Sequence, residues 1–231
     1  MRQHSLWDNE SILCICQFGT DISPKYLFTI KPTNYTLAMK IVVDFHYLHR
    51  KSPCSFSFGL FCKKCARILG IIVYGTPSSP TLRTGICGKD EEKNVIELTR
   101  LWVKDGTPKN TESFLIGNTL KRVNKEIIVS FSEIQEGHVG IVYQATNFIY
   151  TGLSAKRPNY KISGENLHTT TVTDEGRGKE NPVLFLREKY GDRFITYDRP
   201  RKHRYIYFNC NKSTRKKLLN KLKYKIHPYP K

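Results

Sequence analysis

The stretch ELTRLWVKDGTPKNTESFLIGNTLKRVNKEIIVSFSEIQEGHVGIVYQATNFIYTG, residues 97–152, is the most informative part of the chain about its architecture. Its pattern predicts the order strand, loop, helix, strand, polar loop, helix, strand. Residues 97–103 form a short apolar strand, and the β-branched run 127–131 is typical of a buried one. Between them, Asn110 is suited to begin a helix because its short side chain can accept from first-turn amides. This alternation predicts an α/β protein.

The helix after Asn110 has a buried face at helical spacing, made of Ile116, Leu120 and Val123. The chain turns polar where the strand 127–131 ends, and Glu133 stands there. In an open α/β sheet, sites form beyond the carboxyl ends of strands. The sequence therefore makes Glu133 a candidate site residue.

The formal charge is +18 over 231 residues. Such an excess of Lys and Arg indicates a polyanionic partner, most simply DNA, although a basic soluble surface is the plainer alternative. No apolar run is long enough to span a membrane, and no signal peptide is visible, so we expect a cytoplasmic protein. The seven cysteines are then expected to be reduced thiols.

The remaining patterns predict further elements on both sides of residues 97–152 in the sequence. An amphipathic helix is predicted over 35–48, followed by antiparallel strands at 55–61 and 69–74. Residues 75–90 are rich in Gly, Pro, Ser and Thr and predict a long loop, either functional or merely connecting. A final strand is expected over 202–208.

One of two groups of cysteines in the sequence suggests a metal site. Cys62 and Cys65 form a C-x-x-C turn with Cys54 upstream, but a four-ligand zinc site usually needs a second close pair, and none is apparent. Cys14 and Cys16 are interpreted as small buried hydrophobes on a strand. The turn is therefore expected to be a basic hairpin near a phosphate backbone.

The ends of the chain are polar and charged. Residues 154–180 fit either an arm over nucleic acid or a flexible insertion. From residue 199 to the end the chain carries many Lys and Arg, interleaved tyrosines and no acid, which suits phosphates and unpaired bases. We therefore expect an N-terminal extension (1–33), one catalytic domain (34–208) and a basic C-terminal tail (209–231).

The absence of known catalytic motifs disfavours several classes of enzyme. The chain has no G-x-S-x-G elbow, no H-E-x-x-H and no deaminase signature. The element order resembles the acetyltransferase-like (GNAT) fold, in which a mixed sheet, flanked by helices, splays between its fourth and fifth strands. These strands would be 97–103 and 127–131.

A more specific resemblance rests on separate blocks. They are DFHYLHR at 44–50, VYGTPSSP at 73–80, RTGICG at 83–88, ELTRLWV at 97–103, GHVGIVYQATNFIYTG at 137–152 and KHRYIYF at 202–208. In these blocks the chain resembles the bacteriophage Mom family of DNA-modification proteins.

The resemblance implies a late phage enzyme that converts adenine N6 in double-stranded DNA to an N6-methylcarbamoyl (acetamido) derivative and shields the DNA from host restriction. It also implies an iron centre, with Tyr47, Glu133 and Tyr143 as ligands and His46 beside them. Glu133 stands where the family is expected to have aspartate. The glycine-rich pyrophosphate loop of GNAT enzymes is replaced by KDGTPKNTES, which leaves acyl-coenzyme A open as the donor.

These expectations assign further roles. His46 and Tyr47, at the end of a helix, fit either a site or a packing pair. Glu133 or His46 would deprotonate N6 or bind metal, and Tyr143 would stack on a flipped adenine. The candidate DNA contacts, on the backbone or the base edge, are Arg83, Arg100, Gln144, Asn147, Lys202 and Arg204.

Two alternatives remain from the residues alone. One is an acyl-coenzyme A acetyltransferase that acts on a small molecule or protein, which the missing cofactor loop disfavours. The other is a basic DNA-binding protein without catalytic activity.

Overall fold

A computed structural model describes residues 12–167 and 169–231. The chain divides into two compact units. The first comprises the described residues up to Ser132 together with 138–152 and 203–231, and the second comprises 133–137 and 153–202. The second is an insertion between two strands of the first, which differs from the single domain expected over 34–208.

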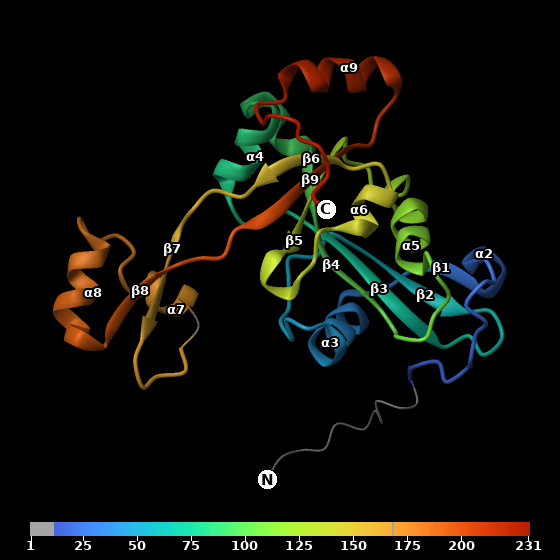
Figure 1. The fold of residues 1–231 in the computed structure, drawn as a ribbon, viewed down its shortest axis with the longest axis horizontal. Coiled ribbons are helices and arrows are strands. Elements are labelled where there is room, and N and C mark those ends of the chain that lie inside the picture. Colours follow the sequence, from blue (N-terminus) through green and yellow to red (C-terminus); the bar gives the residue numbers. More distant parts are fainter. Residues whose placement is uncertain (1–11, 168) are drawn as a thin grey trace, which may run out of the picture. The chain divides into compact units, whose positions relative to one another are not determined.

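A seven-stranded mixed sheet forms the centre of the first unit, in the order β1-β2-β3-β4-β5-β9-β6 (Figure 1). The strands β1 to β4 are antiparallel neighbours, and β4 pairs with β5 in parallel. The strands are β1 (Phe28–Pro32), β2 (Phe56–Cys62), β3 (Ile68–Gly75), β4 (Val95–Val103), β5 (Ile127–Glu133), β6 (Ile149–Leu153) and β9 (Lys202–Phe208).

The sheet splays between β4 and β5. Their register begins at Val95 opposite Ile127 and ends at Glu97 opposite Val129, although both strands continue. The predicted α/β architecture, with a mixed sheet that separates at these two strands, is confirmed. Beyond this pairing β4 and β5 diverge. We refer to this opening as the splay, and it exposes backbone and side chains of the two strands that a continuous sheet would bury.

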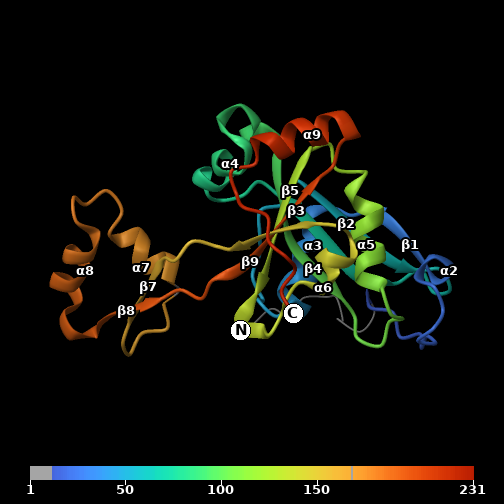
Figure 2. The ribbon, with the colours of Figure 1, turned by 45° about the horizontal axis from the view of Figure 1, so that its top comes forward.

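Helices cover both faces of this sheet. They are α2 (Pro24–Leu27), α3 (Tyr35–Phe45), α4 (Pro80–Cys87), α5 (Thr111–Leu120), α6 (Ile141–Ala145) and α9 (Lys212–Lys221), with short 3-10 turns at Lys89–Asn94 and Ile134–Glu136. Figure 2 shows α4 and α9 lying side by side. No helix of the described residues is long and apolar enough to cross a membrane.

Alternating residues of β3 separate the two faces of the core. Ile71 and Val73 pack with α3, whereas Ile72 and Tyr74 belong to the cluster that includes α5. This is the period-two alternation expected of a strand buried on both faces. The helix α3 begins where predicted, since Asn34 accepts a hydrogen bond from the amide of Leu37 over 2.9 Å.

The second unit has a small core of its own. It contains β7 (Pro158–Ile162), α7 (Thr169–Glu175), α8 (Pro182–Tyr190), a 3-10 turn (Gly191–Arg193) and β8 (Phe194–Asp198), and β7 pairs antiparallel with β8. Ile162, Val172, Leu186 and Phe194 are its buried residues. Residues 154–180 are thus neither a simple arm nor an unstructured insertion.

Three boundaries differ from the sequence-based expectation. The predicted loop 75–90 contains α4, because Ser79 caps a helix that Pro80 begins and Ile86 anchors in the core. The strand expected to carry Cys14 and Cys16 is, within the described residues, an isolated bridge between Leu13 and Ile68. The expected N-terminal extension also contributes β1 to the sheet.

The C-terminal residues are an ordered part of the first unit. Leu218 of α9 is buried, and the amide of His227 donates to the carbonyl oxygen of Tyr150 over 3.0 Å. The Tyr229 hydroxyl donates to the carbonyl oxygen of Phe148 over 2.7 Å. The basic C-terminal tail expected over 209–231 therefore contains the helix α9 and packs on the first unit.

Candidate functional site

His46 directly follows α3, and its side chain is only 5% exposed. The amide of Leu48 donates to its Nδ1 over 3.1 Å. Burial, together with the positive charge of Arg100 and the nearby His49, lowers the pKa of His46 to about 4. His46 is therefore neutral near pH 7, and Nε2 carries its proton.

Tyr47 and His138 extend this cluster. The ring of Tyr47 stacks on His46 with the centroids 4.4 Å apart, and it meets the ring of His138 edge-on at 6.0 Å. The hydroxyl of Ser132 donates to the carbonyl oxygen of His138 over 2.6 Å and fixes the backbone there. His138 was not among the predicted site residues, because it follows a loop whose path no local pattern indicates.

Arg100 lies on β4 beyond the point where the strand separates from β5. It is opposite Val73 in the β3–β4 register, and Val73 packs with α3. Its guanidinium donates to the carbonyl oxygens of Arg50 and Thr99. Arg100 therefore braces the segment after α3 and supplies positive charge near His46. Its predicted contact with the DNA backbone stays a prediction.

Tyr143 lies in the core on the α5 side of the sheet. It is 8% exposed and its ring packs against Phe148 and Tyr205. Burial raises its pKa to about 12, and the charges of Glu97 and Tyr205 act in the same direction, while a hydrogen bond with Ser130 on β5 opposes them. The ring is packed within the core, its hydroxyl reaches the splay, and the predicted stacking on adenine stays a prediction.

Glu133 ends β5 and is ion-paired with Lys202, which begins β9. Both side chains are mostly buried, at 16% and 26% exposed. Each side chain therefore neutralises the charge of the other. For Glu133 to act as a base, or for Lys202 to bind a phosphate, this ion pair would have to break.

The iron centre that the resemblance implies, with Tyr47, Glu133 and Tyr143 as ligands, stays a prediction. Burial holds the proton on Tyr143 when no metal is bound, so a bound ion would have to displace it. Glu133 is neutralised by Lys202, and the ring of Tyr47 stacks on His46. His46 is also unsuited to coordination through Nδ1, whose lone pair accepts from Leu48. We assign no step to iron at these residues.

A groove of about 680 Å³ lies on the α5 side of the sheet. Asn110 and Ser113 at the start of α5 contribute to it, and no side chain of the described residues caps that first turn. Lys109 and Lys121 add two positive charges against the one negative charge of Asp21, and Asn147 and Tyr207 also line the groove. Amides at a helix N-terminus beside two lysines suit an anionic group.

Most of the remaining residues that were predicted to contact DNA form hydrogen bonds or ion pairs within the protein. Gln144 donates to the carbonyl oxygen of Val139 over 3.2 Å. Arg83 is ion-paired with Glu92 over 2.8 Å. Arg204 is 8% exposed, donates to Thr151 and lies 3.4 Å from the ring centroid of Tyr224. Arg204 thus holds the C-terminal segment on the sheet, and its predicted contact with DNA stays a prediction. Asn147, by contrast, is exposed and has a left-handed backbone (φ 61°).

Comparison with known proteins identifies the family. The Mom protein family matches residues 27–231. The chain belongs to the Mom protein family. The methylcarbamoylase Mom of Escherichia phage Mu is 31% identical to it over 201 residues, which cover 84% of this chain and 80% of that protein. The match includes β1 and the C-terminal residues, in agreement with their place in the fold of this Mom-family chain.

Solved structures similar to this Mom-family chain are acetyltransferases. The spermidine/spermine N-acetyltransferase SpeG from Vibrio cholerae covers 84% of this chain and 99% of its own, with 8% identity and a TM-score of 0.46. An acetyltransferase of the GNAT family from Bacillus cereus covers 80% and 99%, with 13% identity and a TM-score of 0.42. At these scores the likeness carries no argument about chemistry.

Proposed function

We propose that this protein is a phage DNA-modification enzyme that adds a methylcarbamoyl (acetamido) group to N6 of adenine and so protects phage DNA from host restriction. The observation that carries the proposal is its relationship to the phage Mu methylcarbamoylase over most of both chains. The enzyme would act in the cytoplasm of the infected host, where the phage DNA is replicated. The excess of positive charge, +18, supports a DNA substrate.

The two faces of the sheet suggest separate places for acceptor and donor. The cluster of His46, Tyr47 and His138 lies where α3 ends, and the groove lies beside α5. Between the faces, β4 and β5 separate, and the Tyr143 hydroxyl lies near Ser130. We place the flipped adenine beside the cluster of His46, Tyr47 and His138, and we place the donor in the groove. The adenine and the transferred group would then meet where β4 and β5 separate.

Each residue of the histidine cluster then has a defined part. Neutral His46 presents Nε2–H and can donate to a carbonyl oxygen of the transferred group or to a ring nitrogen of adenine. Tyr47, 44% exposed, offers a ring face and a hydroxyl to the base. When the bond between N6 and the carbon of the group forms, the bond between that carbon and the donor breaks, and the donor leaves with the bonding electrons. N6 loses a proton, and the exposed imidazole of His138 can accept it.

The groove fits an elongated anionic donor such as an acyl-coenzyme A. The first-turn amides of α5 with Lys109 and Lys121 would hold its phosphates, and Phe114 and Tyr207 would contact its apolar arm. The bound donor would supply an activated carbon for transfer. This groove is also the observation that favours a second candidate, an acetyltransferase that acts on another amine.

The contact with the DNA backbone is best supplied by α9. Its exposed lysines and arginine include Lys212, Arg215 and Lys216, which fall at i, i+3 and i+4 and share one face. The opposite face is anchored by Leu218. This basic face would bind phosphates without reading sequence.

An acceptor test separates the two candidate functions. Purified protein is incubated with a small-molecule extract of a bacterial host and with duplex DNA that contains either adenine or hypoxanthine, which lacks the N6 amine. The proposal predicts a mass gain only on the duplex with adenine. A gain on both duplexes refutes N6 as the acceptor, and modification of amines in the extract without any change to DNA favours the second candidate.

A further inference from the structure

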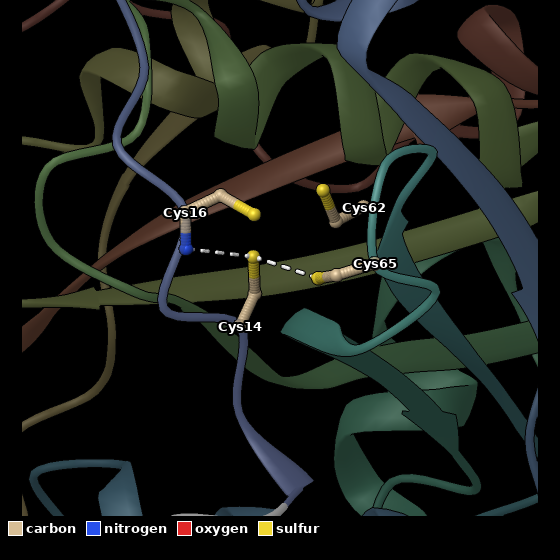
Figure 3. Close-up of side chains that lie close together, drawn as sticks. All are labelled: Cys14, Cys16, Cys62 and Cys65. Atoms are coloured by element: carbon tan, nitrogen blue, oxygen red, sulfur yellow. Dashed lines mark hydrogen bonds between the residues drawn. The ribbon is translucent and has the colours of Figure 1, made fainter.

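Four cysteine side chains from two distant parts of the sequence converge in the first unit (Figure 3). Cys14 and Cys16 come from the N-terminal segment, whereas Cys62 ends β2 and Cys65 lies in the turn between β2 and β3. All four sulfur atoms lie within 4.8 Å of one another. The sequence-based expectation that the C-x-x-C turn has no second pair of cysteines is therefore wrong.

The spacing of these sulfurs suits a tetrahedral metal. A zinc ion about 2.3 Å from each of four thiolates requires them to be roughly 3.8 Å apart. The Sγ atoms of Cys65 and Cys14 are 3.3 Å apart, and the largest separation in the group is within 4.8 Å. Small rotations of the side chains are enough to reach the tetrahedron.

The backbone is arranged to direct all four thiols inward. Ala66 has a left-handed conformation with φ 58°, and this closes the turn after Cys65. The amide of Cys62 donates to the carbonyl oxygen of Arg67 over 2.9 Å, which holds the two ends of the turn together. On the other side, the amide of Cys14 donates to the carbonyl oxygen of Ile68, and that of Cys16 to the Cys14 sulfur over 3.4 Å. Amide donation to sulfur stabilises a thiolate.

The charge around the cluster suits a bound ion as well. Zinc with four thiolates has a net charge of minus two, which is costly beside a hydrophobic core unless cations lie near. The ammonium group of Lys104 donates to the carbonyl oxygen of Cys14 over 2.6 Å. Lys63 and Lys64 lie within the C-x-x-C turn itself, and Arg67 follows it. These cations offset the charge of the metal–thiolate group.

We propose that Cys14, Cys16, Cys62 and Cys65 bind one structural zinc ion. Tetrahedral coordination by four sulfurs leaves no open position, so the ion has no part in the transfer reaction. A closed site of this kind instead joins the N-terminal segment to the end of β2 and the turn that follows it. It lies apart from the histidine cluster and requires none of the proposed chemistry.

The site also supports one wall of the groove. The chain runs from Cys16 to Thr20, Ile22 and Pro24, which line the groove, and the amide of Lys109 donates to the carbonyl oxygen of Thr20. Zinc fixes the beginning of this segment to the β2–β3 turn. Loss of the ion should therefore loosen the groove wall before it affects the sheet.

Metal content tests the proposal directly. The full chain is purified under reducing conditions without chelator, and its metals are measured by inductively coupled plasma mass spectrometry. We expect one zinc ion per chain in the native protein and in Cys54→Ser, whose half-buried thiol lies outside the cluster. Cys65→Ser, with an equally half-buried thiol, should lose zinc.

A spectroscopic measurement covers the case in which Cys65→Ser fails to fold. Native protein stripped of metal and loaded with Co²⁺ should show the intense visible absorption of tetrahedral cobalt and the ultraviolet band of cobalt–thiolate bonds. Absence of zinc together with absence of these bands overturns the proposal. So do stoichiometric iron at these thiolates, and a disulfide among the four found by mass spectrometry in the freshly purified protein.

Discussion

The amide of Leu48 donates to Nδ1 of His46 over 3.1 Å. This bond comes from the residue two positions along the chain, so the turn that ends α3 sets the tautomer of the ring. A neutral imidazole that accepts at Nδ1 has its proton at Nε2, and it can donate but not accept there. The structure therefore favours His46 as a hydrogen-bond donor over the general base that the sequence allowed.

Replacing His46 by Gln should lower DNA modification by about 100-fold or more, because the loss of one oriented donor to a developing charge costs roughly that factor. DNA binding should be unchanged. His49→Gln is the matched control, since His49 is exposed and only three residues away. The fraction of modified deoxyadenosine, measured by mass spectrometry of digested DNA, checks the prediction. Equal losses in both variants would remove His46 from the site.

The buried His46 should also make the protein sensitive to acid. Its pKa falls from about 6.5 to about 4 on folding, so the unfolded chain binds a proton first as the pH decreases. The free energy of unfolding should decrease as the pH falls from about 6.5 to about 4, and His46→Gln should show a shallower decrease. Urea unfolding at several pH values measures both slopes. Parallel slopes would show that the ring is protonated in the folded protein.

Tyr143→Phe should remove most of the modifying activity and leave the fold intact. The change deletes only the hydroxyl that interacts with Ser130 at the splay. Tyr150→Phe is a close control, because Tyr150 is equally buried at 8% and its hydroxyl instead contacts His203 over 2.8 Å. Nucleoside analysis and circular dichroism are the measurements. Full activity of Tyr143→Phe would confine Tyr143 to a packing role.

Lys212→Gln with Lys216→Gln should weaken DNA binding by removing two exposed charges from one face of α9. The slope of log affinity against log salt should become less steep by about 0.9 for each phosphate that this face no longer neutralises. Lys31→Gln with Lys51→Gln removes the same charge from exposed positions elsewhere on the unit. Fluorescence anisotropy over a range of salt concentrations compares the pairs. Identical slopes would refute the role of α9.

Arg204→Met should destabilise the protein by about 2–4 kcal/mol, because a buried, hydrogen-bonded cation is removed and Thr151 loses its donor. Modification per folded molecule should be preserved. Chemical denaturation and nucleoside analysis together check this. A variant of normal stability with weak DNA affinity would restore Arg204 to the DNA-binding surface.

The sequence predicts the parts of this fold that depend on local periodicity. The alternation in β3 and the apolar run in β5 place both strands within the sheet, and Asn34 marks the start of α3. The helix α4 was missed because Gly, Pro and Thr dominate its composition. There Ser79 and Pro80 act as a helix start, as their positions would have allowed us to infer.

Tertiary contacts explain what local patterns did not predict. Cys14 and Cys16 meet Cys62 and Cys65 only because the N-terminal segment lies against β3, and no spacing within either segment indicates that contact. Arg204 and Lys202 appear as free cations in a basic stretch, yet Thr151 and Glu133 engage them. The charge of a sequence therefore indicates a binding partner only when the charged residues that are engaged within the protein are left out of the count.

Modification of adenine in DNA can be measured by expressing the protein in a bacterial host and fragmenting the nucleosides of the host DNA in a tandem mass spectrometer. We expect a deoxyadenosine heavier by an acetamido group, with the added mass retained on the adenine fragment and the other three nucleosides unchanged. An unmodified deoxyadenosine profile from a well-expressed, DNA-binding protein, or modification of a different nucleoside, would refute the proposed activity.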